Sequence, residues 1–132
     1  MKIRFLGTLV GAAIVLAVSG AASAANEVGQ SHFERVCAAC HLPTGEGVPG
    51  VFPPLKQSDY FKKATPAQLV KLLNNGLTGE VTVNGQRFNS VMPPQTLSDE
   101  ETAAILNYVS AGLNGGKASW TPEQVKRLRA AK

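Results

Sequence analysis

Cys37-Ala38-Ala39-Cys40-His41 is the most informative run of residues in this chain of 132. On a helix, positions i, i+3 and i+4 share one face, so the two thiols and the imidazole project together. A C-x-x-C-H run is the attachment signature of a c-type haem. We therefore predict one covalent haem c, held through its vinyl groups by the cofactor-binding residues Cys37 and Cys40. His41 is then a metal ligand that approaches the iron from the same side.

Three other uses of a C-x-x-C pair compete with this interpretation: a thioredoxin-like dithiol, a structural disulfide and half of a zinc site. Zinc disagrees with the ligand count, because only His32 and His41 accompany the two cysteines. A thioredoxin-like motif requires a βαβ context, whereas residues 30–36 indicate a helix. A disulfide stays open, although closing so short a loop would constrain the unfolded chain little.

The first residues have the pattern of an export signal. Lys2 and Arg4 form a charged region, residues 5–18 are apolar, and Ala22-Ser23-Ala24 is a typical cleavage site. We expect a signal peptide over residues 1–24, cleaved after Ala24, and a mature protein in the periplasm without a membrane span. The alternative is an uncleaved anchor, because residues 5–25 can cross a bilayer if their small residues are counted.

The size and charge of the remaining chain limit its fold and partners. Residues 25–132 are enough for one domain, which we divide into a haem domain over 25–115 and a tail over 116–132. The formal charge of the whole chain is +4, and removal of Lys2 and Arg4 lowers it to +2. A value so near zero argues against general binding of nucleic acid.

Three helix starts carry the pattern of a capping box, in which a hydroxyl residue precedes a Glu or Gln by three positions. They are Thr65-Pro66-Ala67-Gln68, Ser98-Asp99-Glu100-Glu101 and Thr121-Pro122-Glu123-Gln124. The predicted helices cover residues 66–74, residues 99–111 with Gly112 as the stop, and a tail helix from Pro122 to the end.

The other predicted elements are an early helix and a hairpin. The helix covers about residues 27–39, and the Gly- and Pro-rich residues 45–54 after it indicate a loop. Residues 81–83 and 86–88 flank Asn84-Gly85, a strong signal for a tight β-hairpin.

Met92 is the only methionine left once Met1 is removed with the signal. It lies in Val91-Met92-Pro93-Pro94, where two prolines fix φ and stiffen the loop. We predict Met92 as the second metal ligand, on the haem face opposite His41; the alternative is a methionine that fills a gap in the core. His32 is rejected, because it lies nine residues before His41 on one helix, about 13 Å along the axis.

Haem iron that is bound by both His and Met has no open position for a substrate. We therefore expect one-electron transfer rather than catalysis, and the protein is predicted not to be an enzyme. An enzyme or sensor with a ligand-accessible iron would require Met92 to be off the metal.

The order CAACH, FPPL and VMPP, followed by a capped amphipathic helix, resembles a class I c-type cytochrome over about residues 28–113. The resemblance implies an all-α fold around one haem, here with a small β-hairpin before the Met loop. It also implies close packing of Gly29 and Phe33 in the first helix against Tyr108 in the last. Pro53 matches the proline whose carbonyl accepts a hydrogen bond from the haem-binding imidazole.

The hairpin and the tail resemble those of cytochromes linked to copper nitrite reductases, and the hairpin also those of quinoprotein alcohol dehydrogenase haem domains. The implied partners are redox proteins of a respiratory chain: a copper nitrite reductase, a terminal oxidase or a quinoprotein dehydrogenase. We expect a free, monomeric periplasmic carrier; the alternative is a permanently bound haem subunit of a dehydrogenase or reductase complex.

The tail itself is open to two interpretations. Trp120, Val125 and Leu128 would lay it on the body of the domain. Alternatively, its basic face would dock an acidic partner. The basic side chains are Lys126, Arg127, Arg129 and Lys132.

Overall fold

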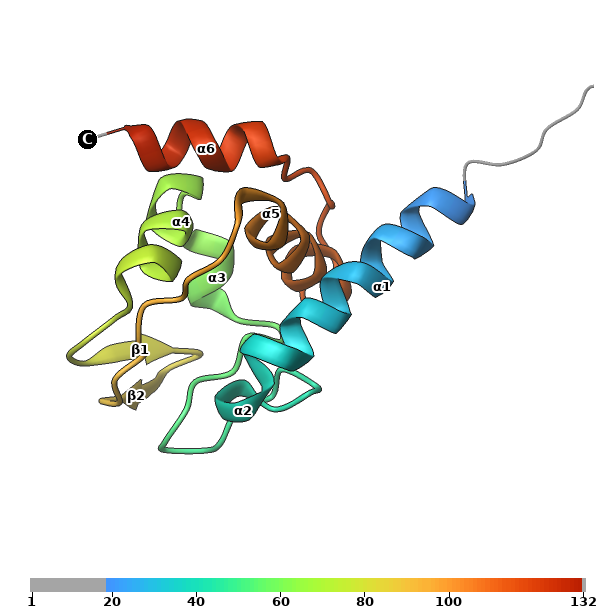
Figure 1. Cartoon of the computed structure of the whole chain (residues 1–132). Helices are drawn as coiled ribbons and strands as arrows, with labels where there is room; N and C mark the ends of the chain where they lie inside the picture. The colour runs from blue at the N-terminus through green and yellow to red at the C-terminus, as the bar shows by residue number, and fades with distance from the viewer. Residues whose placement is uncertain (1–18, 132) are drawn as a thin grey trace, which may run out of the picture.

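The computed structural model describes residues 19–131, with side chains from residue 24, and shows a mostly helical domain with one small hairpin (Figure 1). None of the helices in this part of the chain has the length and hydropathy needed to cross a membrane. The elements are α1 (Ser19–Val36), α2 (Ala38–His41), α3 (Asp59–Lys63), α4 (Pro66–Asn75), β1 (Val81–Val83), β2 (Gln86–Phe88), α5 (Asp99–Asn107), the π-helix η1 (Tyr108–Leu113) and α6 (Pro122–Ala130).

The three predicted helix starts are confirmed. At α4 and α5 the side chains of Thr65 and Ser98 accept from the third helical N–H, and the Gln or Glu there bonds back to the cap N–H. At α6 the hydroxyl of Thr121 accepts from the Gln124 N–H at 3.2 Å. These caps satisfy backbone donors that the first turn of a helix leaves free.

The first helix differs from the prediction at both ends. Within the described residues α1 is helical from Ser19 rather than from Glu27, because the alanine-rich residues before Glu27 favour helix. It ends at Val36, where Cys37 separates it from α2, although the N–H of His41 still donates to the Cys37 carbonyl at 2.9 Å. The predicted cleavage site lies within α1, and the part of the predicted signal over residues 1–18 lies outside the described residues.

Gly112 does not stop the last helix of the haem domain, so that prediction was wrong. α5 continues into η1, which ends at Leu113. A Cβ on Gly112 would lie 2.9 Å from the Tyr108 ring and 3.2 Å from the Asn26 side chain, so glycine here permits close packing. The chain turns only at Gly115, which has a φ of 66°.

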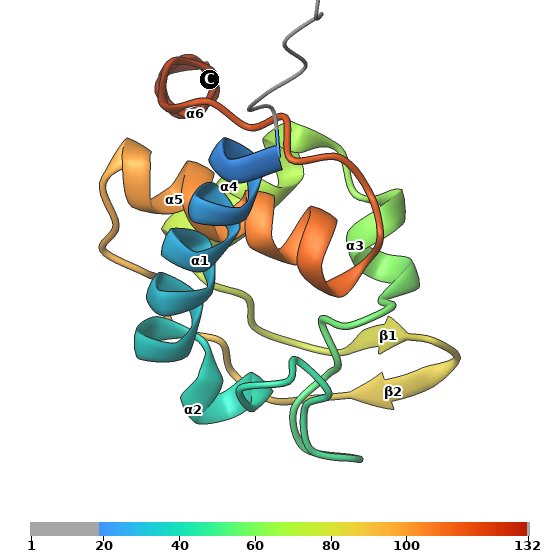
Figure 2. The ribbon, with the colours of Figure 1, turned by 90° about the vertical axis from the view of Figure 1, so that its right-hand side faces the viewer.

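α1 crosses directly over α5 and η1, as Figure 2 shows. A Cβ on Gly29 would stand 2.4 Å from the carbonyl oxygen of Ala104 and 2.9 Å from the Cβ of Tyr108, so the backbones are in contact. The rings of Phe33 and Tyr108 pack with centroids 5.2 Å apart and an interplanar angle of 55°. The predicted packing of Gly29 and Phe33 against Tyr108 is confirmed.

Two apolar clusters form the core. One lies between α1 and the α5–η1 segment, and the other joins α4, α5 and α6. In the second, Val125 of α6 is fully buried, and Trp120 and Leu128 pack against it. Asn107 secures the segment before α6, because its amide exchanges hydrogen bonds of 2.8 and 2.9 Å with the Trp120 backbone. The tail therefore lies on the body, as the first interpretation expected.

The hairpin is confirmed, with Val83 paired to Gln86 and a positive φ at both Asn84 and Gly85. The short helix α3 was not predicted. Ser58 caps it, since its hydroxyl accepts from the N–H of Phe61 at 3.2 Å. Asp59 and Asn84 exchange side chain–backbone hydrogen bonds of 2.6 and 2.9 Å, which dock the hairpin turn onto α3.

We predict that Gly29→Ala lowers the free energy of unfolding by about 1–3 kcal/mol, the cost of overpacking a close contact. The better helix propensity of alanine returns at most about 1 kcal/mol. Denaturant unfolding followed by far-ultraviolet circular dichroism measures the change. Ser31→Ala, at an exposed position of α1, is the control and should change stability by less than about 0.5 kcal/mol. Equal stability of both variants would contradict the backbone contact.

Candidate functional site

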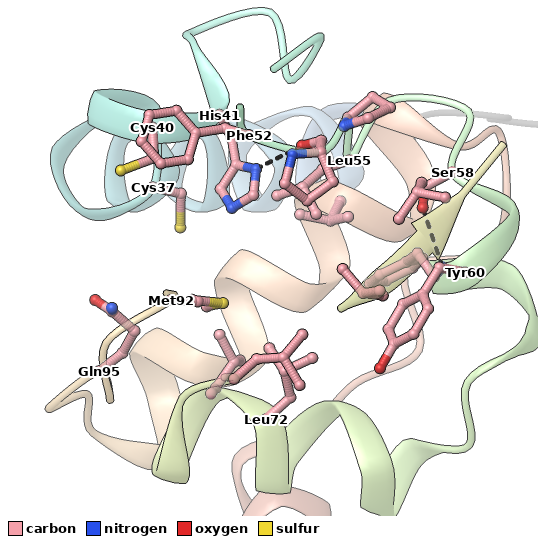
Figure 3. Close-up of a pocket in the computed structure, with 18 of the residues that line it drawn as sticks. Cys37, Cys40, His41, Phe52, Leu55, Ser58, Tyr60, Leu72, Met92 and Gln95 are labelled. Carbon is pink, nitrogen blue, oxygen red and sulfur yellow. Dashed lines mark hydrogen bonds between the residues drawn. The ribbon is translucent and has the colours of Figure 1, made fainter. Parts of the chain in front are cut away.

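A cavity of about 350 Å³ lies between α2 and the following loop on one side and α4, the hairpin and the Met92 loop on the other (Figure 3). Most of its lining is apolar, from Phe, Leu, Val, Ile and Pro side chains. The volume falls in the range of sites for organic ligands and cofactors, which combine apolar walls with a few placed polar groups.

The first wall carries Cys37, Cys40 and His41, which all line the cavity. They stand within one helical turn, and Figure 3 shows the imidazole and the Cys37 sulfur projecting into the open space. Both cysteines are free thiols. Burial, helped by the neighbouring Cys40, raises the pKa of the Cys37 thiol to about 11.

Pro53 fixes the orientation of the His41 ring. Nδ1 of His41 lies 2.8 Å from the Pro53 carbonyl oxygen, which can only accept, so Nδ1 carries the hydrogen. Burial lowers the pKa of His41, opposed in part by this hydrogen bond. The imidazole is therefore held neutral, with the lone pair of Nε2 free to bind a metal.

Asn114 supports the loop that carries Pro53. Its amide group donates to the carbonyls of Leu55 and Val109 at 2.8 and 2.9 Å, and its oxygen accepts from the N–H of Ser58 at 3.0 Å. These bonds tie the end of the loop to η1. The position of Pro53 in the first wall is thus set by Asn114, a residue 61 positions farther along the chain.

Met92 lies on the opposite wall and faces the side of His41 across the cavity (Figure 3). An isolated two-residue bridge holds its backbone, with N–H donation in both directions between Met92 and Leu77 at 2.9 Å. Farther along the loop, the N–H of Gln95 donates to the Leu73 carbonyl at 2.8 Å. The C-terminal end of α4 and the residues after it therefore hold the Met92 loop.

His32 does not line the cavity. It lies on the surface of α1, where Nδ1 is 2.7 Å from Nη2 of Arg35 and 3.7 Å from the carboxylate of Glu101. This agrees with its rejection as an iron ligand on the basis of the sequence.

Four polar side chains of the lining were not recognised from the sequence: Ser58, Tyr60, Ser90 and Gln95. No motif marks them, because each reaches the cavity only through the tertiary arrangement. Gln95 follows Met92 by three residues, and its amide donates to the Pro93 carbonyl at 2.8 Å, which braces the loop from within.

The competing uses of the cysteine pair are disfavoured. Cys37 and Cys40 form no disulfide. Within residues 19–131, no three His, Cys, Asp or Glu side chains gather in a way that would hold a metal ion. A reactive dithiol needs a thiolate, whereas the raised pKa of Cys37 keeps its thiol protonated near neutral pH.

The donor set fits a haem. Two thiols on one helical turn suit covalent attachment along one edge, and imidazole and thioether are both iron ligands in haem proteins. The remaining walls are apolar, as the faces of a porphyrin require.

Comparison with known proteins agrees with this fit. The family model described as "Cytochrome c" matches residues 27–112. Cytochrome c-552 of Thermus thermophilus is 38% identical over 105 residues, which cover 73% of this chain and 80% of that protein. The fructose dehydrogenase cytochrome subunit of Gluconobacter japonicus is 29% identical, over 77% of this chain and 22% of its own length. The cbb3-type oxidase subunit CcoP of an Azospirillum species is 33% identical, over 78% and 34%.

The hairpin wall yields a pH-dependent prediction. Val81, Val83 and Phe88 line the cavity, and the Asp59–Asn84 pair docks their hairpin. The hydrogen bond from the Asn84 N–H, and then the contact with Lys63, lower the pKa of Asp59. Because the folded-state pKa is depressed, the stabilisation is present above the unfolded pKa of about 3.9 and is lost as pH falls through the folded value.

We therefore expect Asp59→Asn to be less stable than the wild type at neutral pH, and the difference to vanish at pH values well below about 4. Denaturant unfolding at a series of pH values measures it. The control is Glu123→Gln on the exposed surface of α6, which removes one negative charge as Asp59→Asn does. Asp99→Asn is not a suitable control, because it would alter a different contact. A difference that stays constant from neutral to acid pH would contradict the assignment.

Proposed function

The chain belongs to the cytochrome c family, and we propose that it is a periplasmic single-haem carrier whose iron is bound by His41 and Met92. As a member of this family it holds a covalent haem c and is an electron carrier, not an enzyme. Cys37 and Cys40 are proposed as the two thioether anchors, and Pro53 as the acceptor that orients the His41 ring.

One observation carries the ligand assignment: His41 and Met92 enter the same cavity from opposite walls, and the backbone near each is fixed. When bound, the haem supplies an iron that changes oxidation state by one electron, and a thioether ligand raises its potential. Pro53 keeps the His41 proton on Nδ1, and Leu77 holds Met92 in place. The apolar walls exclude water, which disfavours the more highly charged ferric state and so raises the potential further.

The mouth of the cavity suits brief contact with a redox partner. Val51 and Val91 are 45% and 67% exposed; Val91 lines the cavity, and Val51 adjoins Phe52 of the lining. The Ser90 hydroxyl donates to the Val51 carbonyl, so the loops on the two sides of the mouth are joined there. A small apolar patch at the mouth would let a partner approach without a large buried interface.

The partners are proposed to be redox proteins of a respiratory chain: a copper nitrite reductase, a terminal oxidase or a quinoprotein dehydrogenase. Two relatives are named as subunits of a fructose dehydrogenase and of a cbb3-type oxidase, which favours the second candidate, a permanently bound haem subunit. Against permanent binding through the tail, α6 lies at the opposite end of the molecule from α2 (Figures 1 and 2). A partner on α6 would be far from the cysteines.

We predict that Met92→Ala lowers the reduction potential by at least about 0.1 V, within the range of about 0.8 V over which axial ligands set haem potentials. The ferric protein should lose the weak far-red band of methionine–iron charge transfer, and the ferrous protein should bind carbon monoxide at neutral pH. Potentiometry and absorption spectra measure these changes.

The control for this experiment is the retention of the haem. It should stay bound to Met92→Ala after acid–acetone extraction, because Cys37 and Cys40 are unchanged. Met92→His should restore a closed iron with a lower potential than the wild type. An unchanged potential and band in Met92→Ala would overturn the assignment of Met92.

A free carrier should purify from its native host as a monomer. At about 1 M salt the screening length is about 3 Å, so only a tight, largely apolar interface would survive. We expect the haem-containing protein to elute alone from a sizing column at that salt concentration. A redox enzyme that still co-elutes at 1 M salt would identify the subunit alternative and contradict the free carrier.

A further inference from the structure

α6 lies beyond residues 27–112, which the cytochrome c family model matches, yet it is built into the core through the fully buried Val125. Its basic side chains differ in their exposure to solvent. Lys126 and Arg127 are exposed, whereas the side chain of Arg129 is only 26% exposed and turns towards the body.

The Arg129 guanidinium makes hydrogen bonds to four groups in three parts of the chain. The acceptors are Asn74 Oδ1 in the last turn of α4 at 3.1 Å, the Leu97 carbonyl at 2.9 Å, and Asp99 Oδ1 and Thr102 Oγ1 at the start of α5 at 2.6 and 2.9 Å. Asp99 is only 25% exposed and Thr102 is fully buried.

Two of these acceptors, Leu97 and Asn74, lie where the Met92 loop is held in place. Residues 93–98 run from Met92 to α5 without regular structure, and Leu97 lies near their end. At its other end the loop is held by Leu77 and Leu73, and Asn74 directly follows Leu73. Arg129 therefore ties the end of α4, which holds the loop near Met92, to the far end of the same loop.

Packing points the same way. Met92 and α6 contact the same apolar cluster, formed by Leu69, Val70, Leu73, Ala103, Leu106 and Val125. A displacement of α6 would thus loosen both the cluster behind Met92 and the hydrogen bonds at the end of its loop.

We propose that Arg129 is a positioning residue that keeps the Met92 sulfur within reach of the haem iron. The inference rests on the proposed ligation by Met92. Charge-assisted bonds from a planar guanidinium fix direction as well as distance, which a lysine cannot reproduce at four acceptors. Without them, the Leu97 carbonyl and the buried Thr102 hydroxyl lose a partner, and the loop loses its anchor beside α5.

The test compares the local and the global stability of the haem-loaded protein. Ferric protein is unfolded with increasing concentrations of guanidinium chloride. The far-red methionine–iron band and the far-ultraviolet circular dichroism are followed in the same sample. The variants are Arg129→Leu, Arg129→Lys, the exposed control Arg127→Leu, and Gly29→Ala, which crowds the contact of α1 with Ala104 and Tyr108 away from the Met92 loop.

We expect Arg129→Leu to lose the band at a lower guanidinium concentration than the helical signal, with the gap between the two midpoints wider than in the wild type. Without denaturant, the fraction of ferrous protein that binds carbon monoxide should rise about tenfold, the factor that corresponds to the loss of about one charge-assisted hydrogen bond. Arg129→Lys should lie between Arg129→Leu and the wild type. Gly29→Ala should lower both midpoints together, and Arg127→Leu should change neither.

Parallel shifts of both midpoints in Arg129→Leu, with carbon monoxide binding as in the wild type, would overturn the proposal and leave Arg129 a purely structural residue. If Arg129→Leu does not yield haem-loaded protein, Arg129→Lys gives the same comparison with the charge kept. A wild-type protein without the far-red band would instead overturn the ligation by Met92 and this inference with it. A wild-type band with no effect of Arg129 overturns only the inference.

Discussion

The direct backbone contact between α1 and α5 is the constraint on which the rest of the arrangement depends. A Cβ on Gly29 would stand 2.4 Å from the Ala104 carbonyl oxygen, so only glycine at this position lets the two helices approach as closely. This crossing places α1, and α2 follows it directly in the chain with one interruption at Cys37. The contact that places the thiols and the imidazole at the cavity is therefore made eight residues before Cys37.

Each wall of the cavity is supported by residues from a later part of the chain. Asn114 supports the loop that carries Pro53, and Arg129 supports the loop that carries Met92. In both cases a side chain with several donors binds main-chain carbonyls of a segment without regular structure. Irregular loops of this kind have no ladder of their own, so side-chain hydrogen bonds take over the role of fixing them. The tail is thus part of the site's framework rather than an appendage.

Features with a local cause could be predicted from the sequence. The caps at Thr65 and Ser98 and the Asn84-Gly85 turn depend on neighbouring residues only, and all three form as expected. Features with a tertiary cause could not. Gly112 follows the local rule for a helix stop, but its place against Tyr108 overrides that rule. Arg129 looks like Lys126 and Arg127 in the sequence, and only the packing of α6 on the body brings it to its acceptors. The five residues of α3 are too few to show a periodic pattern.

The residues that line the cavity come from positions between Val36 and Val109 of the chain. α1 packs on α5 and η1, near the far end of that range. The pocket therefore cannot close while only the first half of the polypeptide has been made, since chains emerge from the N-terminus onward. During that interval Cys37 and Cys40 have no opposite wall, and their thiols remain exposed to solvent. Late folding of the domain thus keeps the two thiols accessible for as long as the chain is incomplete.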